Sequence, residues 1–348
     1  MKNFFLHDPN LLIYGFIMVF FASFGQTFYI ALFNEDIRNL YRITDGEFGL
    51  VYAIATLVSS FLFINFAKLI DKIDLRFYSI GVTFGLAFAC IGFYFIFDNI
   101  IHLFLILFLL RFFGQGAMTH AGSTSMARYF LIDRGKAISV ATLGGMLGIM
   151  FLPKIVVNLD LYFNFKTLWF LTTLTLLILI PIIYFILYNQ KRRDVSLKRN
   201  IDNEKTHKTW TITEILKDRV FFIYFPLAAS FPFIGTGLMF HQIYIFDAKG
   251  WTMEMLGNGY IYFGLFSILG LLIGGPLIDK INTKKAIPFV LLPLLVCITV
   301  LLFYDSYWSF VVYMSLFGFN LGLSAPFMGS LWAEIYGVKS IGTAKALL

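Results

Sequence analysis

The sequence predicts an all-α membrane protein built from two related helical bundles. Of its 348 residues, 59% are hydrophobic and only 14% are charged, so the chain has more apolar surface than a water-soluble domain could bury. Ten apolar runs are each long enough to cross about 30 Å of hydrocarbon as a helix. The string Leu-Ile-Asp-Lys-Ile occurs twice, at residues 69–73 and 277–281, each time between two such runs. A repeated loop of this kind indicates a duplicated unit.

The ten runs divide the chain into two halves and a linker. We expect an N-terminal six-helix bundle over residues 1–188, a cytoplasmic linker over 189–219 and a C-terminal bundle over 220–348. The first run is longer than the core of a signal peptide and no small-residue cleavage site follows it, so it should remain as a helix. The runs cover residues 11–33, 48–67, 77–97, 100–127, 137–157, 167–188, 220–246, 256–278, 286–304 and 306–333.

Alignment of the two halves predicts that the second one stops early. Gly116 matches Gly322, and with the same offset Leu348 corresponds to Thr142, close to the start of the fifth run. The chain would then hold helices 7 to 10 and the start of helix 11. On a plan of two six-helix halves, we therefore expect a sequence truncated after about ten transmembrane helices.

The basic residues predict the orientation. Two of the 27 Lys and Arg residues lie within the runs, Arg111 and Lys154. With a cytoplasmic N-terminus, the loops on the outer side carry only Arg38, Arg42, Lys166 and Lys249, and all other basic residues lie inside. This asymmetry predicts a multi-pass protein of the inner or plasma membrane with its N-terminus in the cytoplasm. The net charge of +7 then reflects topology, with the lipid bilayer and not nucleic acid as the partner, and we expect a monomer.

The linker and the cysteines indicate no further chemistry. Residues 211–218 are expected to form a short amphipathic helix, and the linker's basic residues suit a solvated loop near anionic lipid. Cys90 and Cys297 lie at equivalent places inside apolar runs, where a small hydrophobic residue packs well. We expect neither a disulfide nor a metal site, and no cofactor.

The repeated loop resembles a signature of the major facilitator superfamily, G-x-L-x-D-[RK]-x-G-[RK]-[RK]. The first copy replaces both glycines but keeps Leu69, Asp71, Lys72 and Arg76. The second copy keeps Gly275, Leu277, Asp279, Lys280 and Lys284. The resemblance covers the whole chain through its topology. It implies two six-helix halves that transport a solute by alternating access.

Shorter segments are similar to one branch of that family. These segments are residues 111–116, with an arginine followed by glycines, residues 134–137, and the spacing Thr211-x-x-Glu214. They resemble segments of the monocarboxylate and oxalate/formate carriers. The exporter pattern of helix 5 is only half present, since Gly144 and Gly148 have the right spacing but Pro153 comes late. Those glycines are expected to let helices pack closely, which argues against a drug exporter.

Arg111 is the leading candidate for binding a substrate. None of the 20 Asp and Glu residues lies within the runs, so the membrane interior is net positive. Charge in hydrocarbon is costly and tends to mark function, and a guanidinium can hold a carboxylate through two hydrogen bonds. The alternative is a structural Arg111 bonded to a neighbouring helix. Lys154 lies near the outer end of its run, where its side chain can reach water.

The resemblance implies that helices 1, 4, 7 and 10 line a central cavity. His120 lies nine residues from Arg111 and is expected to pack rather than bind. Proton coupling would have to use His241 or His120, so anion exchange or uniport is favoured. The polar residues selected as substrate ligands are Gln26, Tyr29, Arg111, Gln115, His241, Gln242, Asn320 and Ser324.

The repeated acids are expected to act as gates. A carboxylate at a cytoplasmic helix end can stabilise the positive N-terminus of a helix from the other half. In the family pattern Asp71, with Arg76, would face the start of helix 11 near Gly342. Asp279, with Lys280, would face the start of helix 5 near Gly135. The alternative for either acid is a solvated loop position.

These observations predict a secondary or facilitative transporter of a small solute, an organic anion such as a monocarboxylate. A carrier of neutral or cationic metabolites or drugs, with a structural Arg111, is the main alternative. A membrane-embedded enzyme would need paired acids or an acid and a histidine near the interface, which the sequence does not show, so we do not expect an enzyme. A non-transporting truncated fragment is the remaining alternative.

Overall fold

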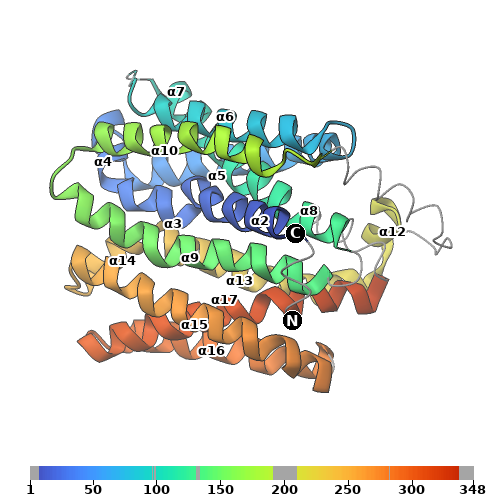
Figure 1. The fold of residues 1–348 in the computed structure, drawn as a ribbon. Coiled ribbons are helices and arrows are strands. Elements are labelled where there is room, and N and C mark those ends of the chain that lie inside the picture. The colour runs from blue at the N-terminus through green and yellow to red at the C-terminus, as the bar shows by residue number, and fades with distance from the viewer. Residues whose placement is uncertain are drawn as a thin grey trace. The chain divides into compact units, whose positions relative to one another are not determined.

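The computed structural model describes residues 8–95, 97, 99–130, 134–190, 210–281 and 283–336. This part of the chain is helical, without strands, and the chain divides into two units, Met1–Glu204 and Lys205–Leu348 (Figure 1). Their boundary falls within the segment predicted as the linker. Seven of the described helices are long and apolar enough to cross a membrane, and a bent pair makes an eighth. The predicted all-α membrane fold is confirmed.

The first predicted span is broken and is not one helix. It consists of α2 (Pro9–Phe21), η1 (Ala22–Gly25), α3 (Thr27–Ile30), η2 (Ala31–Phe33) and α4 (Asn34–Tyr41). At Gln26 the backbone is extended, with φ −86° and ψ 153°, and the two parts of the span are bent by 43°. Within a membrane the released backbone groups must find other partners. Arg111 supplies one of them, because its Nη1 donates to the carbonyl oxygen of Gly25.

The fourth predicted span is a single rod with a widened middle. It runs through α7 (Ile100–Leu109), the π-helical segment η4 (Leu110–Met118) and α8 (Thr119–Tyr129). A π-helical turn inside an α-helix is rare and is frequently found at functional sites. Arg111 is the second residue of this segment.

The other helices of the first unit pack in pairs (Figure 1). α2 packs on α9 (Arg134–Asp160), where Gly144 leaves no room for a side chain, since a Cβ there would lie 2.1 Å from the carbonyl oxygen of Phe16. α6 (Leu75–Gly92) packs on α10 (Phe165–Ile186), and the ring of Phe93, directly after α6, packs against Trp169 of α10. The remaining span is α5 (Asp45–Phe66), followed by η3 (Ala67–Asp71). The close packing expected of the helix 5 glycines is therefore present.

In the described part of the chain, the second unit begins with a short helix directly before α13. It contains α12 (Ile212–Lys217), α13 (Arg219–Phe240), α14 (Gln242–Ala248), α15 (Met253–Ile281), α16 (Thr283–Phe303) and α17 (Tyr307–Tyr336). The predicted seventh span is broken at His241, whose φ of −92° and ψ of 16° end α13. α17 packs closely on α15, where a Cβ on Gly322 would lie 2.0 Å from the carbonyl oxygen of Ser267.

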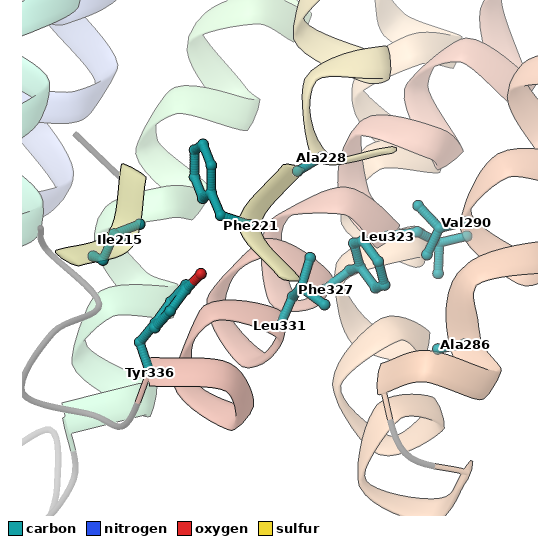
Figure 2. Close-up of a cluster of buried hydrophobic side chains, with 9 residues drawn as sticks. All are labelled: Ile215, Phe221, Ala228, Ala286, Val290, Leu323, Phe327, Leu331 and Tyr336. Carbon is teal, nitrogen blue, oxygen red and sulfur yellow. The ribbon is translucent and has the colours of Figure 1, made fainter. Parts of the chain in front are cut away.

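The predicted amphipathic helix at residues 211–218 is present as α12. Thr211 and Glu214 cap it reciprocally, which gives this pair a local structural role. Figure 2 shows Ile215 of α12 in one apolar cluster with Phe221 and Tyr336. The Tyr336 hydroxyl donates to Asp218, and Asp218 in turn caps α13. The helix is thus held by both apolar and polar contacts.

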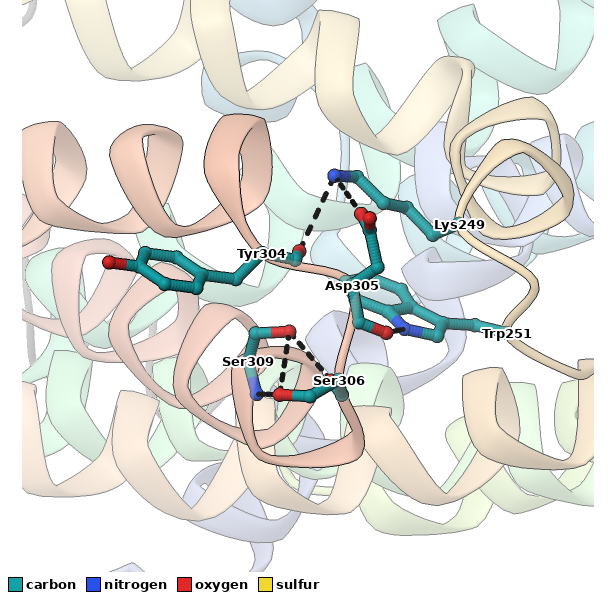
Figure 3. A network of polar contacts seen from close by, with 6 residues as sticks. All are labelled: Lys249, Trp251, Tyr304, Asp305, Ser306 and Ser309. Atoms are coloured by element: carbon teal, nitrogen blue, oxygen red, sulfur yellow. Dashed lines mark hydrogen bonds and ion pairs between the residues drawn. The ribbon is translucent and has the colours of Figure 1, made fainter.

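At the opposite end of the second unit, polar contacts join two loops (Figure 3). Lys249 lies 2.5 Å from the carboxylate of Asp305, and the indole N–H of Trp251 donates to the carbonyl oxygen of Asp305 at 2.9 Å. Ser306 caps the start of α17 by accepting from the backbone N–H of Ser309. These contacts fix the loop after α14 to the start of α17.

Candidate functional site

Arg111 lies in a ring of uncharged partners from three elements. It is only 3% exposed. Its Nε donates to Thr56 Oγ1 at 3.2 Å, and its Nη1 donates to the Gly25 carbonyl oxygen at 3.3 Å and to Thr27 Oγ1 at 3.2 Å. The guanidinium carbon lies 5.2 Å from the ring centroid of Tyr52, whose hydroxyl donates to Thr27 Oγ1 at 2.8 Å. We call these five residues the Arg111 site.

No carboxylate of the described residues pairs with the charge of Arg111. None of the ion pairs in the described part of the chain includes Arg111, and its Nη2 makes no hydrogen bond there. A buried charge without an opposite charge is costly, although hydrogen bonds and an aromatic face reduce that cost. These contacts therefore stabilise the buried guanidinium of Arg111 in part, and a bound anion would stabilise it further.

The break in the first span and the π-helical segment lie at the same place. Gly25 and Gly114 are in direct backbone contact, since a Cβ on Gly114 would lie 2.6 Å from the Gly25 Cα. The predicted ligands Gln26 and Gln115 each follow one of these glycines, and Gln26 is half-buried while Gln115 is exposed. The structure thus brings the backbones of Gln26, Arg111 and Gln115 to one helix crossing.

Tyr29 lies away from this crossing. It is 2% exposed, its hydroxyl is 2.9 Å from Thr172 Oγ1 of α10, and its ring packs edge-on against Trp169. The His120 side chain contacts neighbours of its own unit, with Nδ1 3.1 Å from Thr124 Oγ1. Its ring meets that of Phe63 edge-on at 5.5 Å.

The four predicted ligands of the second unit separate into two places. His241 is exposed at the break between α13 and α14, and its neighbour Gln242 is buried and accepts from the hydroxyl of Tyr260. Asn320 and Ser324 lie one turn apart on α17 and line a cavity of about 220 Å³. Gln242 does not line that cavity.

Asp71 has a partner within its own unit. Arg128, at the end of α8, places Nη1 3.2 Å from Asp71 Oδ1 and donates from the same atom to the carbonyl oxygen of Ile70 at 3.1 Å. The Asp71 side chain remains 68% exposed. The predicted partner region near Gly342 lies outside the described residues.

The other predicted gating residues lie at helix ends. Arg76 pairs with Asp74 at 2.8 Å, and Asp74 caps α6, so this pair orders the start of that helix. Gly135 lies in the first turn of α9, and a Cβ there would meet nothing within 4 Å. Asp279 and Lys280 lie in the last turn of α15, and Lys280 is exposed.

Sequence reasoning identified Arg111 but missed the residues that hold it. Tyr52 and Thr56 are four residues apart and share one face of α5, a polar stripe that the sequence does show. Thr27 gave no such signal, because it directly follows a break that hydropathy does not reveal.

The comparisons with known proteins agree on one family. The sequence model of the Major Facilitator Superfamily matches residues 15–348. The chain belongs to the major facilitator superfamily. It is therefore a multi-pass membrane protein with a transporter fold, which confirms the family resemblance, while its similarity to the monocarboxylate branch gains no support from these comparisons. No curated protein matches the chain.

Solved transporters share this fold. A bacterial homologue of the human lysosomal transporter Spinster, in an inward-facing and unoccupied conformation, is 14% identical with a TM-score of 0.70. That match covers 98% of this chain and 78% of the homologue. The nucleoside transporter NupG is 12% identical with a TM-score of 0.71, over 97% of this chain and 87% of its own. At such identities the likeness shows the fold alone.

Proposed function

We propose that this protein is a secondary or facilitative carrier that moves a small organic anion, such as a monocarboxylate, across the cell membrane by alternating access. Membership of the superfamily supports transport. The observation that supports an anion is the burial of Arg111 without an ion pair to a described carboxylate. A bound carboxylate would supply the missing negative charge and accept from Nη2.

Binding at this position would engage both irregular segments. Arg111 bonds to both sides of the break in the first span, at Gly25 and at Thr27. An anion that draws the guanidinium toward itself competes with these two acceptors. Occupancy of the site would thereby alter the contact between the first and fourth spans. Since none of the 20 Asp and Glu residues lies within the ten apolar runs of the sequence, anion exchange or uniport is the mode we propose.

A second candidate is a carrier of neutral or cationic metabolites. Three hydrogen bonds from Arg111 to the first and second spans favour it, because they suit a residue whose role is to hold helices together. In that case the substrate would bind elsewhere and Arg111 would only stabilise the fold.

Uptake into proteoliposomes separates these candidates. We would compare Arg111→Lys and Arg111→Gln with Thr56→Val, a matched control that removes one partner of Arg111 and keeps its charge. Labelled lactate and labelled uridine serve as anionic and neutral probes. Since a hydrogen bond to a charged group contributes about 1.5–3 kcal/mol, Arg111→Gln should reduce lactate uptake by about 10- to 150-fold. Arg111→Lys should lose less, and Thr56→Val should retain most uptake.

Each other outcome has a defined meaning. Unchanged lactate uptake by folded Arg111→Gln would exclude the anion role. Loss of uridine and lactate uptake together with a lower melting temperature would favour the structural role. If the unaltered chain carried neither probe, the anion proposal for small monocarboxylates would be contradicted.

A further inference from the structure

The second unit contains a cavity that the Arg111 site does not share. Its volume is about 220 Å³. A dry apolar cavity of about 150 Å³ holds one benzene molecule, so this one has room for a slightly larger molecule. Figure 2 shows three of its lining residues, Ala228 of α13, Val290 of α16 and Phe327 of α17. The walls are otherwise formed mainly by leucines.

One buried polar atom in this cavity has no partner. Asn320 is 1% exposed, and its side-chain N–H donates to the carbonyl oxygen of Val290. Its Oδ1 makes no hydrogen bond in the part of the chain that the structure describes. Buried polar atoms are nearly always paired, and an unpaired acceptor is costly. A ligand with one donor would remove that cost.

The two hydroxyl groups that line the cavity also offer acceptors. Ser230 donates its hydroxyl hydrogen to the Leu227 carbonyl oxygen at 2.7 Å, and Ser324 donates to the Asn320 carbonyl oxygen at 2.8 Å. Each hydroxyl oxygen therefore keeps only lone pairs to offer. None of the described residues that line the cavity is charged. A carboxylate would meet these acceptor oxygens with only the second N–H of the Asn320 amide to donate to it and no positive charge beside it, so it would be disfavoured.

The position of Asn320 differs between the two halves. In the alignment that pairs Gly116 with Gly322, Asn320 corresponds to Gly114. Gly114 permits direct backbone contact with Gly25 in the first unit. At the same position the second unit has a side chain, and a cavity lies between α13, α16 and α17. The duplicated plan thus differs here by a glycine in one copy and an asparagine in the other.

We propose that this cavity binds a small uncharged molecule with an apolar body and one hydroxyl or N–H donor, of the size and kind of a phenol. The donor bonds to Asn320 Oδ1 while the ring contacts the leucines. This site is independent of the proposed anion transport, since it requires nothing from Arg111.

Fluorine NMR titrations of the purified full chain in detergent test the proposal. The probes are 4-fluorophenol, 4-fluorotoluene and 4-fluorobenzoate, with empty micelles as the correction for partitioning. We expect the phenol to bind about 5- to 100-fold more tightly than the toluene, since only the phenol pairs with the buried acceptor. The benzoate should show no saturable binding.

The variants isolate Asn320. In Asn320→Ala the cavity stays and the acceptor is lost, so the phenol and the toluene should bind equally. Asn320→Leu replaces the amide with an apolar group and serves if the alanine variant does not fold. Asn164→Ala, an asparagine change at the cap of α10, should keep the full preference, and so should Arg111→Gln.

Three results would overturn the inference. They are equal affinity of the unaltered chain for phenol and toluene, a phenol preference that survives in Asn320→Ala and Asn320→Leu, and benzoate binding as tight as that of phenol. Because Arg111→Gln is expected to bind phenol normally, failure here is distinguishable from failure of the anion proposal.

Discussion

Gly25 and Gly114 control how closely the first and fourth spans approach beside Arg111. A Cβ on Gly25 would lie 2.2 Å from the Leu110 carbonyl oxygen, and one on Gly114 would lie 2.6 Å from the Gly25 Cα. Both contacts are with backbone atoms, so rotation of a side chain could not relieve them. This close approach brings the Gly25 carbonyl within reach of Arg111.

Gly114→Ala should therefore destabilise the protein. Overpacking in a close-packed interior costs about 1–3 kcal/mol, so we expect a lower melting temperature in detergent. Gly81→Ala in α6 is the matched control, because a Cβ there meets nothing within 4 Å. Alanine is favoured over glycine within a helix by about 0.5–1 kcal/mol, so the control should be neutral or slightly stabilised. Equal melting temperatures for the two variants would show that the glycine contact is not needed.

At the same scale, the sequence identified the charge but not its surroundings. Arg111 could be singled out because charge within an apolar run is rare. The partners Thr27 and Thr56 could not be assigned, because a hydroxyl in a span commonly bonds to its own helix. Thr173, for example, donates to the Trp169 carbonyl oxygen. Only three-dimensional packing decides which hydroxyl faces another helix.

At the scale of helices, the sequence predicted where the spans lie but not where they break. Every predicted run is helical over most of its length in the described part of the chain. Hydropathy measures the average over a long window, and a single extended residue such as Gln26 does not change that average. The π-helical stretch in the fourth span is equally invisible, since it adds no polar residue. The capped helix α12, in contrast, was predictable from Thr211 and Glu214 because a capping box has a local sequence pattern.

The loop after α5 carries the acid that we propose as a gate. Asp71 and Arg128 join this loop to the end of α8. Exposed ion pairs contribute only about 0–1 kcal/mol to stability, so Asp71→Asn should leave the melting temperature nearly unchanged. If Asp71 also stabilises one conformation of the transport cycle, uptake should fall several-fold, because a shift of about 1.4 kcal/mol changes a conformational equilibrium tenfold.

Two further variants test whether a loss of uptake in Asp71→Asn is specific to Asp71. Asp45→Asn is the matched control, since Asp45 also forms an ion pair with an arginine, at 3.9 Å from Arg38, at the other end of α5. It should change neither uptake nor stability. If uptake depends only on the ion pair between Asp71 and Arg128, the double variant Asp71→Arg, Arg128→Asp should recover the uptake that Asp71→Asn loses. Full uptake by Asp71→Asn would remove the gating role.

At the scale of the whole chain, duplication is visible in both sequence and structure. Each unit ties the end of its first broken span to the start of its fourth. In the first unit the Tyr41 hydroxyl lies 2.8 Å from His102 Nδ1, and in the second Lys249 pairs with Asp305. The repeat predicted this common plan. It did not predict the cavity beside Asn320, because a void depends on how several helices fill space together and not on any one position.

The duplicated loops also make the topology testable. Because the basic residues favour one side, Lys72 and Lys280 should both lie in the cytoplasm and Tyr162 outside. All three are exposed, so single cysteines can replace them in a Cys90→Ala, Cys297→Ala background from which the two native thiols, both buried and free, have been removed. In right-side-out vesicles, a membrane-impermeant maleimide should label Tyr162→Cys and leave Lys72→Cys and Lys280→Cys unmodified until the membrane is opened. Permeabilised vesicles serve as the control that each thiol can react.

Labelling of Lys72→Cys and Lys280→Cys from opposite sides would contradict two halves of the same orientation. A reversed pattern at all three sites would contradict only the cytoplasmic N-terminus. The charge asymmetry also predicts that Tyr162→Lys, which adds a positive charge to the outer loop, should increase the fraction of molecules inserted in the reversed orientation.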